Sequence, residues 1–192
     1  MRIPVHSRTL AARARSARGL TLLELVFAIT LLLIGISALS RLTVGLARAG
    51  SLARETELAT QAARGMLERI QSESFAQAFR SFNGTGADDP GGANTAPGAS
   101  FAVEGLRALP GDADGAPGEV LMPTTANQPG VLREDLNDPR FSLPQDLDGS
   151  GTIDSVNHAT DYKLLPVLVR VRWQSRDGSS GVVELGTTLA NY

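Results

Sequence analysis

The first part of the chain contains two hydrophobic patterns that follow each other without a break. Residues 20 to 39 are almost continuously apolar, and Glu24 is the only ionisable side chain among them. A helix of about 20 apolar residues can cross the ~30 Å hydrocarbon layer of a membrane. From residue 41 onward, apolar residues recur every three or four positions, which is typical of an amphipathic helix. The pattern predicts a transmembrane helix that continues as an amphipathic one.

Nothing in the sequence interrupts this predicted helix, because no proline lies between Pro4 and Pro90. We therefore expect a single helix from about residue 20 to near residue 79. Four glycines fall within it: Gly35, Gly45, Gly50 and Gly65. Each either lowers helix stability by ~1 kcal/mol relative to alanine or serves as a close-packing point between helices.

The remaining pattern predicts strands separated by irregular segments. Residues 83 to 100 are rich in Gly, Ala, Asn and Asp and predict a mobile connection, followed by weak strands at 101–106 and 119–122. Strict alternation over 164–175 and 181–190 predicts an antiparallel hairpin. We expect one face of the hairpin to pack on the helix through Val167, Val169, Val171 and Trp173, and Arg170 and Arg172 to face water. The predicted fold class is α+β, a long N-terminal helix on a small C-terminal antiparallel sheet.

Charge is distributed unevenly along the chain and predicts its orientation. The first 19 residues hold five arginines and no acidic residue, whereas the rest holds 13 basic and 20 acidic residues. An excess of arginine marks the cytoplasmic side of a membrane span. We therefore expect residues 1–19 to be cytoplasmic and the C-terminal part to be exported. Its net negative charge argues against nucleic acid as a partner.

Composition also excludes several kinds of chemistry. The chain has no cysteine, which removes thiolate metal sites, thiol catalysis and disulfides. Its two histidines are His6 and His158, far apart in the sequence, which argues against zinc. No constellation of nucleophile, base and acid is evident, so we expect the protein not to be an enzyme.

The residues around the start of the apolar segment resemble the processing signal of type IV pilins and type II secretion pseudopilins. In residues 18–26, RGLTLLELV, a basic leader ends at Gly19 and Glu24 is the fifth residue after it, which is the spacing of that family. The expected layout of a long helix followed by a small antiparallel sheet also resembles it, and the closing hairpin looks more like minor pilins than major ones. The chain differs from the family at Leu20, where phenylalanine is usual, and in having no proline near Arg41.

The resemblance implies a series of processing and assembly steps. A prepilin peptidase would cut between Gly19 and Leu20 and methylate the new amine of Leu20, and Glu24 would pair with the amine of a neighbouring subunit during assembly. The implied partners are this peptidase, other pilin or pseudopilin subunits, an inner-membrane assembly platform and, before assembly, membrane lipid. The chain would be a single-pass protein of the bacterial inner membrane and then part of a periplasmic or cell-surface filament.

The resemblance also divides the chain into regions. The leader at 1–19 is removed, and a transmembrane helix at 20–40 is followed by an amphipathic helix at 41–80 and an exported head at 81–192. The expected function is that of a minor pilin of a type IV pilus. A type II secretion pseudopilin and a membrane-anchored, calcium-dependent binding module are the alternatives. The N-terminal segment also has features of a secretory signal peptide or a plain membrane anchor, but neither accounts for Gly19 and Glu24 together.

An acidic loop near the C-terminus resembles the calcium loop of EF-hand proteins. Oxygen-bearing side chains occupy the spacing that such loops use, with Gly151 at the sixth position and Asn157 in place of the final glutamate. Asp161 is a possible substitute for that glutamate. The candidate calcium ligands are Asp146, Asp148, Ser150, Thr152, Asp154 and Asn157. The alternative is a turn rich in Asp and Gly whose side chains cap its own backbone without an ion. Residues 112–115 form a shorter segment of the same kind, and the turn interpretation is favoured there.

Overall fold

The computed structural model describes residues 21–191, and these form an α+β fold. The elements follow in the order α1 (Leu22–Ser72), α2 (Phe75–Phe82), η1 (Gly86–Asp88), β1 (Ser100–Phe101), β2 (Gly118–Leu121), η2 (Pro139–Phe141), β3 (Leu164–Gln174) and β4 (Ser180–Ala190), where η marks a short 3₁₀ helix. The chain divides near Ala47 into two compact units. The second unit, from Arg48 onward, holds the sheet and the core.

Helix α1 runs without a break from Leu22 to Ser72. An added Cβ at any of its four glycines would meet no atom within 4 Å, so the described chain makes no close contact at these positions. The prediction of one helix reaching residue 79 was wrong, because α1 ends at Ser72 and α2 begins at Phe75. The Ser72 hydroxyl donates a hydrogen bond to the carbonyl of Arg69, and serine at such a position competes with continued helix. The break gives α2 its own direction into the core, where Phe79 and Phe82 are fully buried.

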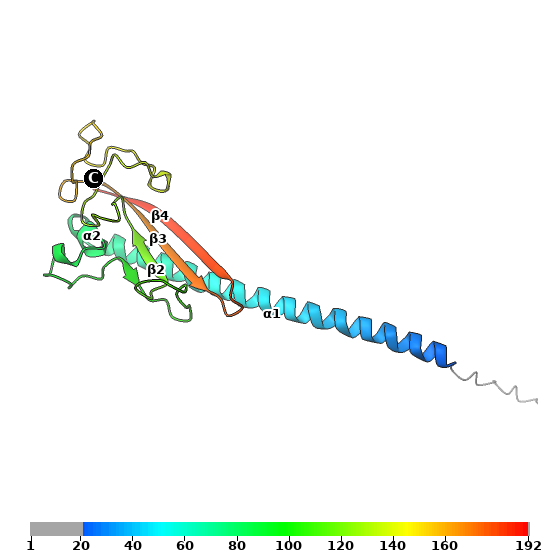
Figure 1. Cartoon of the computed structure of the whole chain (residues 1–192). Coiled ribbons are helices and arrows are strands. Elements are labelled where there is room, and N and C mark those ends of the chain that lie inside the picture. The colour runs from blue at the N-terminus through cyan, green and yellow to red at the C-terminus, as the bar shows by residue number, and fades with distance from the viewer. Residues whose placement is uncertain (1–20, 192) are drawn as a thin grey trace, which may run out of the picture. The chain divides into compact units, whose positions relative to one another are not determined.

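The sheet has the strand order β1-β2-β3-β4, and all its neighbours are antiparallel. Figure 1 shows β2, β3 and β4 side by side. The predicted hairpin is confirmed, with Val169 opposite Leu185 and Trp173 opposite Gly181. Gly181 lets the indole lie against the backbone of β4, since a Cβ there would approach the ring to 2.2 Å. The predicted strand at 101–106 is limited to Ser100–Phe101, because the chain turns away after two residues.

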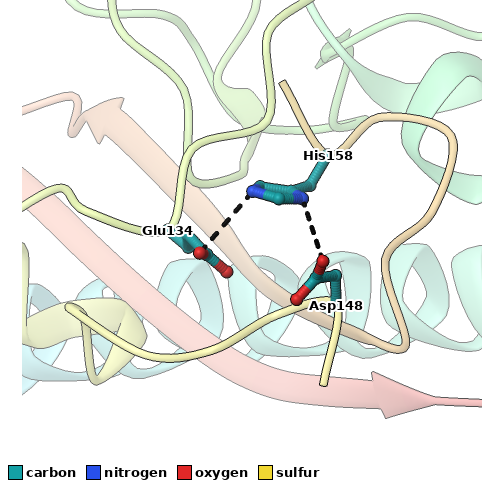
Figure 2. A group of neighbouring side chains, drawn as sticks. All are labelled: Glu134, Asp148 and His158. Carbon is teal, nitrogen blue, oxygen red and sulfur yellow. Dashed lines mark ion pairs between the residues drawn. The ribbon is translucent and has the colours of Figure 1, made fainter. Parts of the chain in front are cut away.

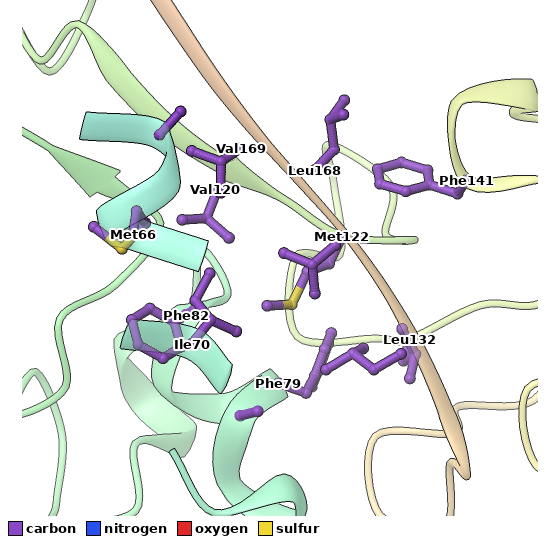
Figure 3. Close-up of a cluster of buried hydrophobic side chains, with 14 of the residues drawn as sticks. Met66, Ile70, Phe79, Phe82, Val120, Met122, Leu132, Phe141, Leu168 and Val169 are labelled. Carbon is purple, nitrogen blue, oxygen red and sulfur yellow. The ribbon is translucent and has the colours of Figure 1, made fainter. Parts of the chain in front are cut away.

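The core lies between the second part of α1, α2 and the sheet, as Figure 3 shows. The residues that α1 buries are spaced by four, three and four positions: Ala59, Ala63, Met66 and Ile70. This spacing places them on one face of the helix. The predicted inward face of β3 is also buried, namely Val167, Val169, Val171 and Trp173. The alternation therefore predicted the buried face of β3, and the helical spacing predicted that α1 buries one face.

The other face of β3 is less exposed than the alternating pattern indicated. Leu168 is buried there, and η2 with Phe141 covers the strand. Arg170 does not simply face water, because its guanidinium lies 2.7 Å from the Glu119 carboxylate on β2 and 3.9 Å from Glu184 on β4. Arg172 is more exposed and lies 3.8 Å from Asp112. On this face of β3, cross-strand ion pairs and the covering η2 segment thus lie where the sequence pattern predicted solvent.

Glu55 joins α1 to the end of the sheet. Its carboxylate accepts a hydrogen bond of 3.0 Å from the indole Nε1 of Trp173 and a second one from the Ser175 hydroxyl. Trp173 is only 3% exposed, so its N–H has little access to water as an alternative partner. A buried donor without an acceptor is destabilising.

Replacing Glu55 with alanine is therefore expected to lower the free energy of unfolding by about 1–2 kcal/mol. Urea denaturation of the full chain in detergent, followed by the fluorescence of its single tryptophan, measures this change. Glu57→Ala is the matched control, because Glu57 is exposed on the same helix and accepts a hydrogen bond only from Gln61 among the described residues. Equal effects of the two substitutions would contradict a specific role for Glu55.

Candidate functional site

The first candidate site is the apolar surface of α1. Every residue from Thr21 to Arg54 is exposed, including large side chains such as Phe27, Ile34 and Leu39, each at least 62% exposed. The apolar side chains point in all directions around the helix axis, which is typical of a helix covered by lipid or by other helices. Within the described residues, α1 is the one helix long and apolar enough to span a membrane.

Polar side chains within this segment are satisfied by the helix itself. The hydroxyl groups of Thr30, Ser37, Ser40 and Thr43 each donate a hydrogen bond to the carbonyl four residues earlier. These groups therefore add little to the difficulty of placing the helix in hydrocarbon. Glu24 remains the one ionisable residue among the described residues before Arg41.

Thr21 caps the start of α1, and Glu24 lies in the first turn of the helix. The backbone N–H of Glu24 donates a 3.3 Å hydrogen bond to the side-chain oxygen of Thr21, so Thr21 caps the helix and Glu24 is its third residue. Threonine followed three residues later by glutamate is the capping-box pattern. An acidic side chain in the first turn also interacts favourably with the positive end of the helix dipole. Gly19 and Leu20, the predicted cleavage site, lie outside the described residues.

The second candidate site is the acidic loop at residues 146–161. Its first part is folded by Asp146, whose Oδ1 accepts hydrogen bonds from the N–H groups of Gly149 and Ser150 and whose Oδ2 accepts one from Gly151. Gly149 and Gly151 have positive φ angles of 69° and 87°, which glycine adopts without strain. The loop therefore has the sharp, oxygen-lined turn that its sequence predicted.

Glu134 closes this loop from a distant part of the chain. It is fully buried, and its two carboxyl oxygens accept hydrogen bonds from Leu147 N at 2.9 Å and Asp154 N at 2.7 Å. The carbonyl of Leu147 in turn accepts hydrogen bonds from the N–H groups of Lys163 and Leu164, which attach the loop to the start of β3. The sequence did not single out Glu134, because nothing local distinguishes it from its exposed neighbour Asp135.

His158 lies inside the loop and is surrounded by carboxylates. Its Nε2 is 3.2 Å from Asp154 and 3.6 Å from Glu134, and its Nδ1 is 3.3 Å from Asp161 and 3.8 Å from Asp148. Figure 2 shows the ring between Glu134 and Asp148. Burial lowers the pKa of His158, but the hydrogen bond with Asp154 and the nearby negative charges outweigh it and leave the pKa above its usual value. The loop thus favours a positive charge at this point.

The structure brings together only some of the predicted calcium ligands. Asp148 and Asp154 lie near the two different ring nitrogens of His158. The Ser150 and Thr152 hydroxyls lie 3.0 Å apart and share a hydrogen bond. The Asn157 side-chain oxygen is occupied, because it accepts hydrogen bonds from Leu132 N and Ala159 N. Calcium binding stays a prediction. In the shorter acidic segment, Asp114 accepts hydrogen bonds from Ser100 and Ala116, as expected of a self-capping turn.

No family model, curated protein or solved structure matches this chain. A functional hypothesis therefore rests on the two candidate sites themselves.

Proposed function

We propose that this protein is a filament subunit, specifically a minor pilin of a type IV pilus, held in the bacterial inner membrane by the first part of α1 until it is assembled. The observation that carries the proposal is the exposed apolar surface of α1 from Leu22 to Leu46, with Glu24 in its first turn. Lipid covers such a surface before assembly, and the helices of other subunits cover it afterwards.

The sequence before α1 supports removal of a leader. Gly19 precedes Leu20 at the spacing from Glu24 that pilins use, and five arginines before the span favour a cytoplasmic location for the leader. Cleavage would create an amino group at Leu20 beside the start of the helix. Such a group has a reference pKa of about 7.7–8.0 and is largely cationic at neutral pH. It can then pair with the Glu24 carboxylate of an adjacent subunit.

The mature protein is accordingly expected to begin at Leu20 with a methylated amine, and Gly19→Val is expected to leave the leader attached. Mass spectrometry of the N-terminal peptide, purified from membranes of a cell that carries the pilus machinery, measures both outcomes. Ala17→Val is the matched control, because it introduces the same valine side chain into the leader but leaves both residues of the predicted cleavage site unchanged. A mature form that retains Met1 in the presence of an active peptidase would contradict the proposed function.

A further inference from the structure

His158 presents an unusual arrangement of its two ring nitrogens. The side chain is only 3% exposed, and its Nδ1 is buried without a hydrogen-bond partner in the described part of the chain. Buried polar atoms normally have such a partner, so an exception in a native structure calls for an explanation such as an unseen ion. The position that Nδ1 faces is therefore a candidate place for a bound ion.

The carboxylates on the two sides of the ring differ in what they already bind. On the Nε2 side, both oxygens of Glu134 accept backbone N–H groups, and Asp154 Oδ1 accepts the N–H of Val156. On the Nδ1 side, Asp148 Oδ1 accepts the N–H of Ser150, whereas Asp148 Oδ2 and Asp161 Oδ1 accept no hydrogen bond from the described residues. The free oxygens and the free nitrogen are therefore on the same side.

The distances on this side suit an ion better than a hydrogen bond. Nδ1 lies 3.3 Å from Asp161 Oδ1 and 3.8 Å from Asp148 Oδ2, but neither contact has hydrogen-bond geometry. Two ligands of a tetrahedral zinc ion, each about 2.0–2.2 Å from the metal, lie roughly 3.4 Å apart. The distance from Nδ1 to Asp161 Oδ1 is close to this spacing, and Asp148 Oδ2 lies somewhat farther from Nδ1.

The Nε2 side provides the support that a metal-binding histidine needs. In metal sites, the second ring nitrogen usually donates its proton to a carboxylate, which fixes the tautomer and the ring orientation. Asp154, at 3.2 Å from Nε2, and the buried Glu134 behind it are placed for this role. One ligand atom each from Glu134, Asp148 and His158 also lies within 4.8 Å of the other two. Figure 2 shows the three side chains next to one another, with the ring between the two carboxylates.

We propose that His158 Nδ1, Asp148 and Asp161 bind one divalent transition-metal ion, with zinc as the best-fitting ion, and that Asp154 and Glu134 position the imidazole. Water completes the coordination, because the side chain of Asp161 is 56% exposed. Calcium requires six to eight oxygen ligands, whereas a mixed set of imidazole and carboxylate suits zinc. The proposal differs from the sequence-based argument against zinc, which considered only a second histidine. The inference does not depend on the proposed function in a filament.

Isothermal titration of the full chain in detergent, after treatment with a chelator, tests the proposal with ZnCl₂ and separately with CaCl₂. We expect one zinc ion per chain, with an affinity for zinc that exceeds the affinity for calcium. Co²⁺ in place of zinc is expected to give a visible absorption band that reports nitrogen and oxygen coordination. His158→Gln and Asp161→Asn are each expected to weaken zinc binding at least tenfold. Loss of a residue that only supports a metal ligand already weakens metal binding by about tenfold or more, and these two residues are proposed ligands.

Two further variants separate loss of the metal site from loss of the fold. Asp161→Asn changes an exposed side chain outside the packed part of the loop, so it serves if His158→Gln fails to fold by circular dichroism. Asp177→Asn, in the β3–β4 turn, is the matched control and should bind zinc as the unmodified chain does. Wild-type affinity in a folded Asp161→Asn or His158→Gln variant would overturn the proposal. So would calcium binding without zinc binding, which would favour the EF-hand prediction, or binding of neither ion, which would leave a protonated His158 held by carboxylates.

Discussion

Glu24→Ala is expected to leave the protein in the membrane but reduce its incorporation into filaments tenfold or more. Insertion becomes easier because the substitution removes an ionisable group from an apolar helix. In the proposed filament, assembly becomes harder because the amine of Leu20 in the neighbouring subunit would lose its partner. Two unit charges about 4 Å apart interact by ~4 kcal/mol at an effective dielectric constant near 20, and ~1.4 kcal/mol is already a tenfold change in an equilibrium.

The position of Glu24 in the first turn of α1 requires a second variant. Both substitutions keep the backbone N–H that donates to Thr21, but Glu24→Ala also removes a side chain of the kind favoured at the third position of a capping box, whereas Glu24→Gln keeps such a side chain and removes only the charge. We expect the glutamine variant to be as poorly incorporated as the alanine variant. Quantifying the subunit in sheared filaments and in membranes by immunoblot separates assembly from insertion.

Ser37→Ala is the control for a polar change within the same span. The Ser37 hydroxyl bonds only to the Leu33 carbonyl of its own helix among the described residues, so its removal should leave incorporation unchanged. Incorporation of Glu24→Gln at the level of the unmodified chain, with only the alanine variant affected, would show that Glu24 acts by capping the helix. That result would contradict the proposed pairing between subunits.

Glu134→Ala is expected to lower the free energy of unfolding by about 3–5 kcal/mol even without any metal. The substitution leaves the N–H groups of Leu147 and Asp154 without their acceptor and removes a carboxyl group next to His158. Because Leu147 is fully buried, its N–H cannot turn to water. A loss of this size is a large part of the stability of an ordinary domain, about 5–15 kcal/mol.

Chemical denaturation in the presence of a chelator, followed by Trp173 fluorescence, measures the loss. Asp135→Ala is the matched control at the next position, because Asp135 is exposed and pairs with Arg133 at the surface. Exposed pairs contribute at most about 1 kcal/mol, so the control should change stability little. A Glu134→Ala variant as stable as the control would show that Glu134 does not hold the loop together.

Some of the fold could be predicted because local pattern alone decides it. The apolar run after Gly19 predicted the first part of α1 by its length, and the three- and four-residue spacing of apolar residues predicted that the second part has one buried face. The alternation of β3 predicted its buried face for the same reason, and Val169 and Trp173 lie where it indicated. The break at residues 73–74 was missed because no proline or glycine marks it. The separate direction of α2 allows Phe79 and Phe82 to be fully buried in the core, and this packing is decided by the tertiary structure.

The acidic loop likewise has one part that its own sequence determines and another that depends on tertiary contacts. The spacing of Asp146, Gly149 and Gly151 determined a tight, oxygen-lined turn, because these residues bond to their own backbone. Only the tertiary structure decided that Glu134, and not Asp135, enters the core to close that turn, and that His158 lies among the carboxylates. Contacts between residues far apart in the chain depend on packing, which leaves no periodic signal in the sequence, whereas helix, strand and turn depend on neighbours that the sequence shows directly.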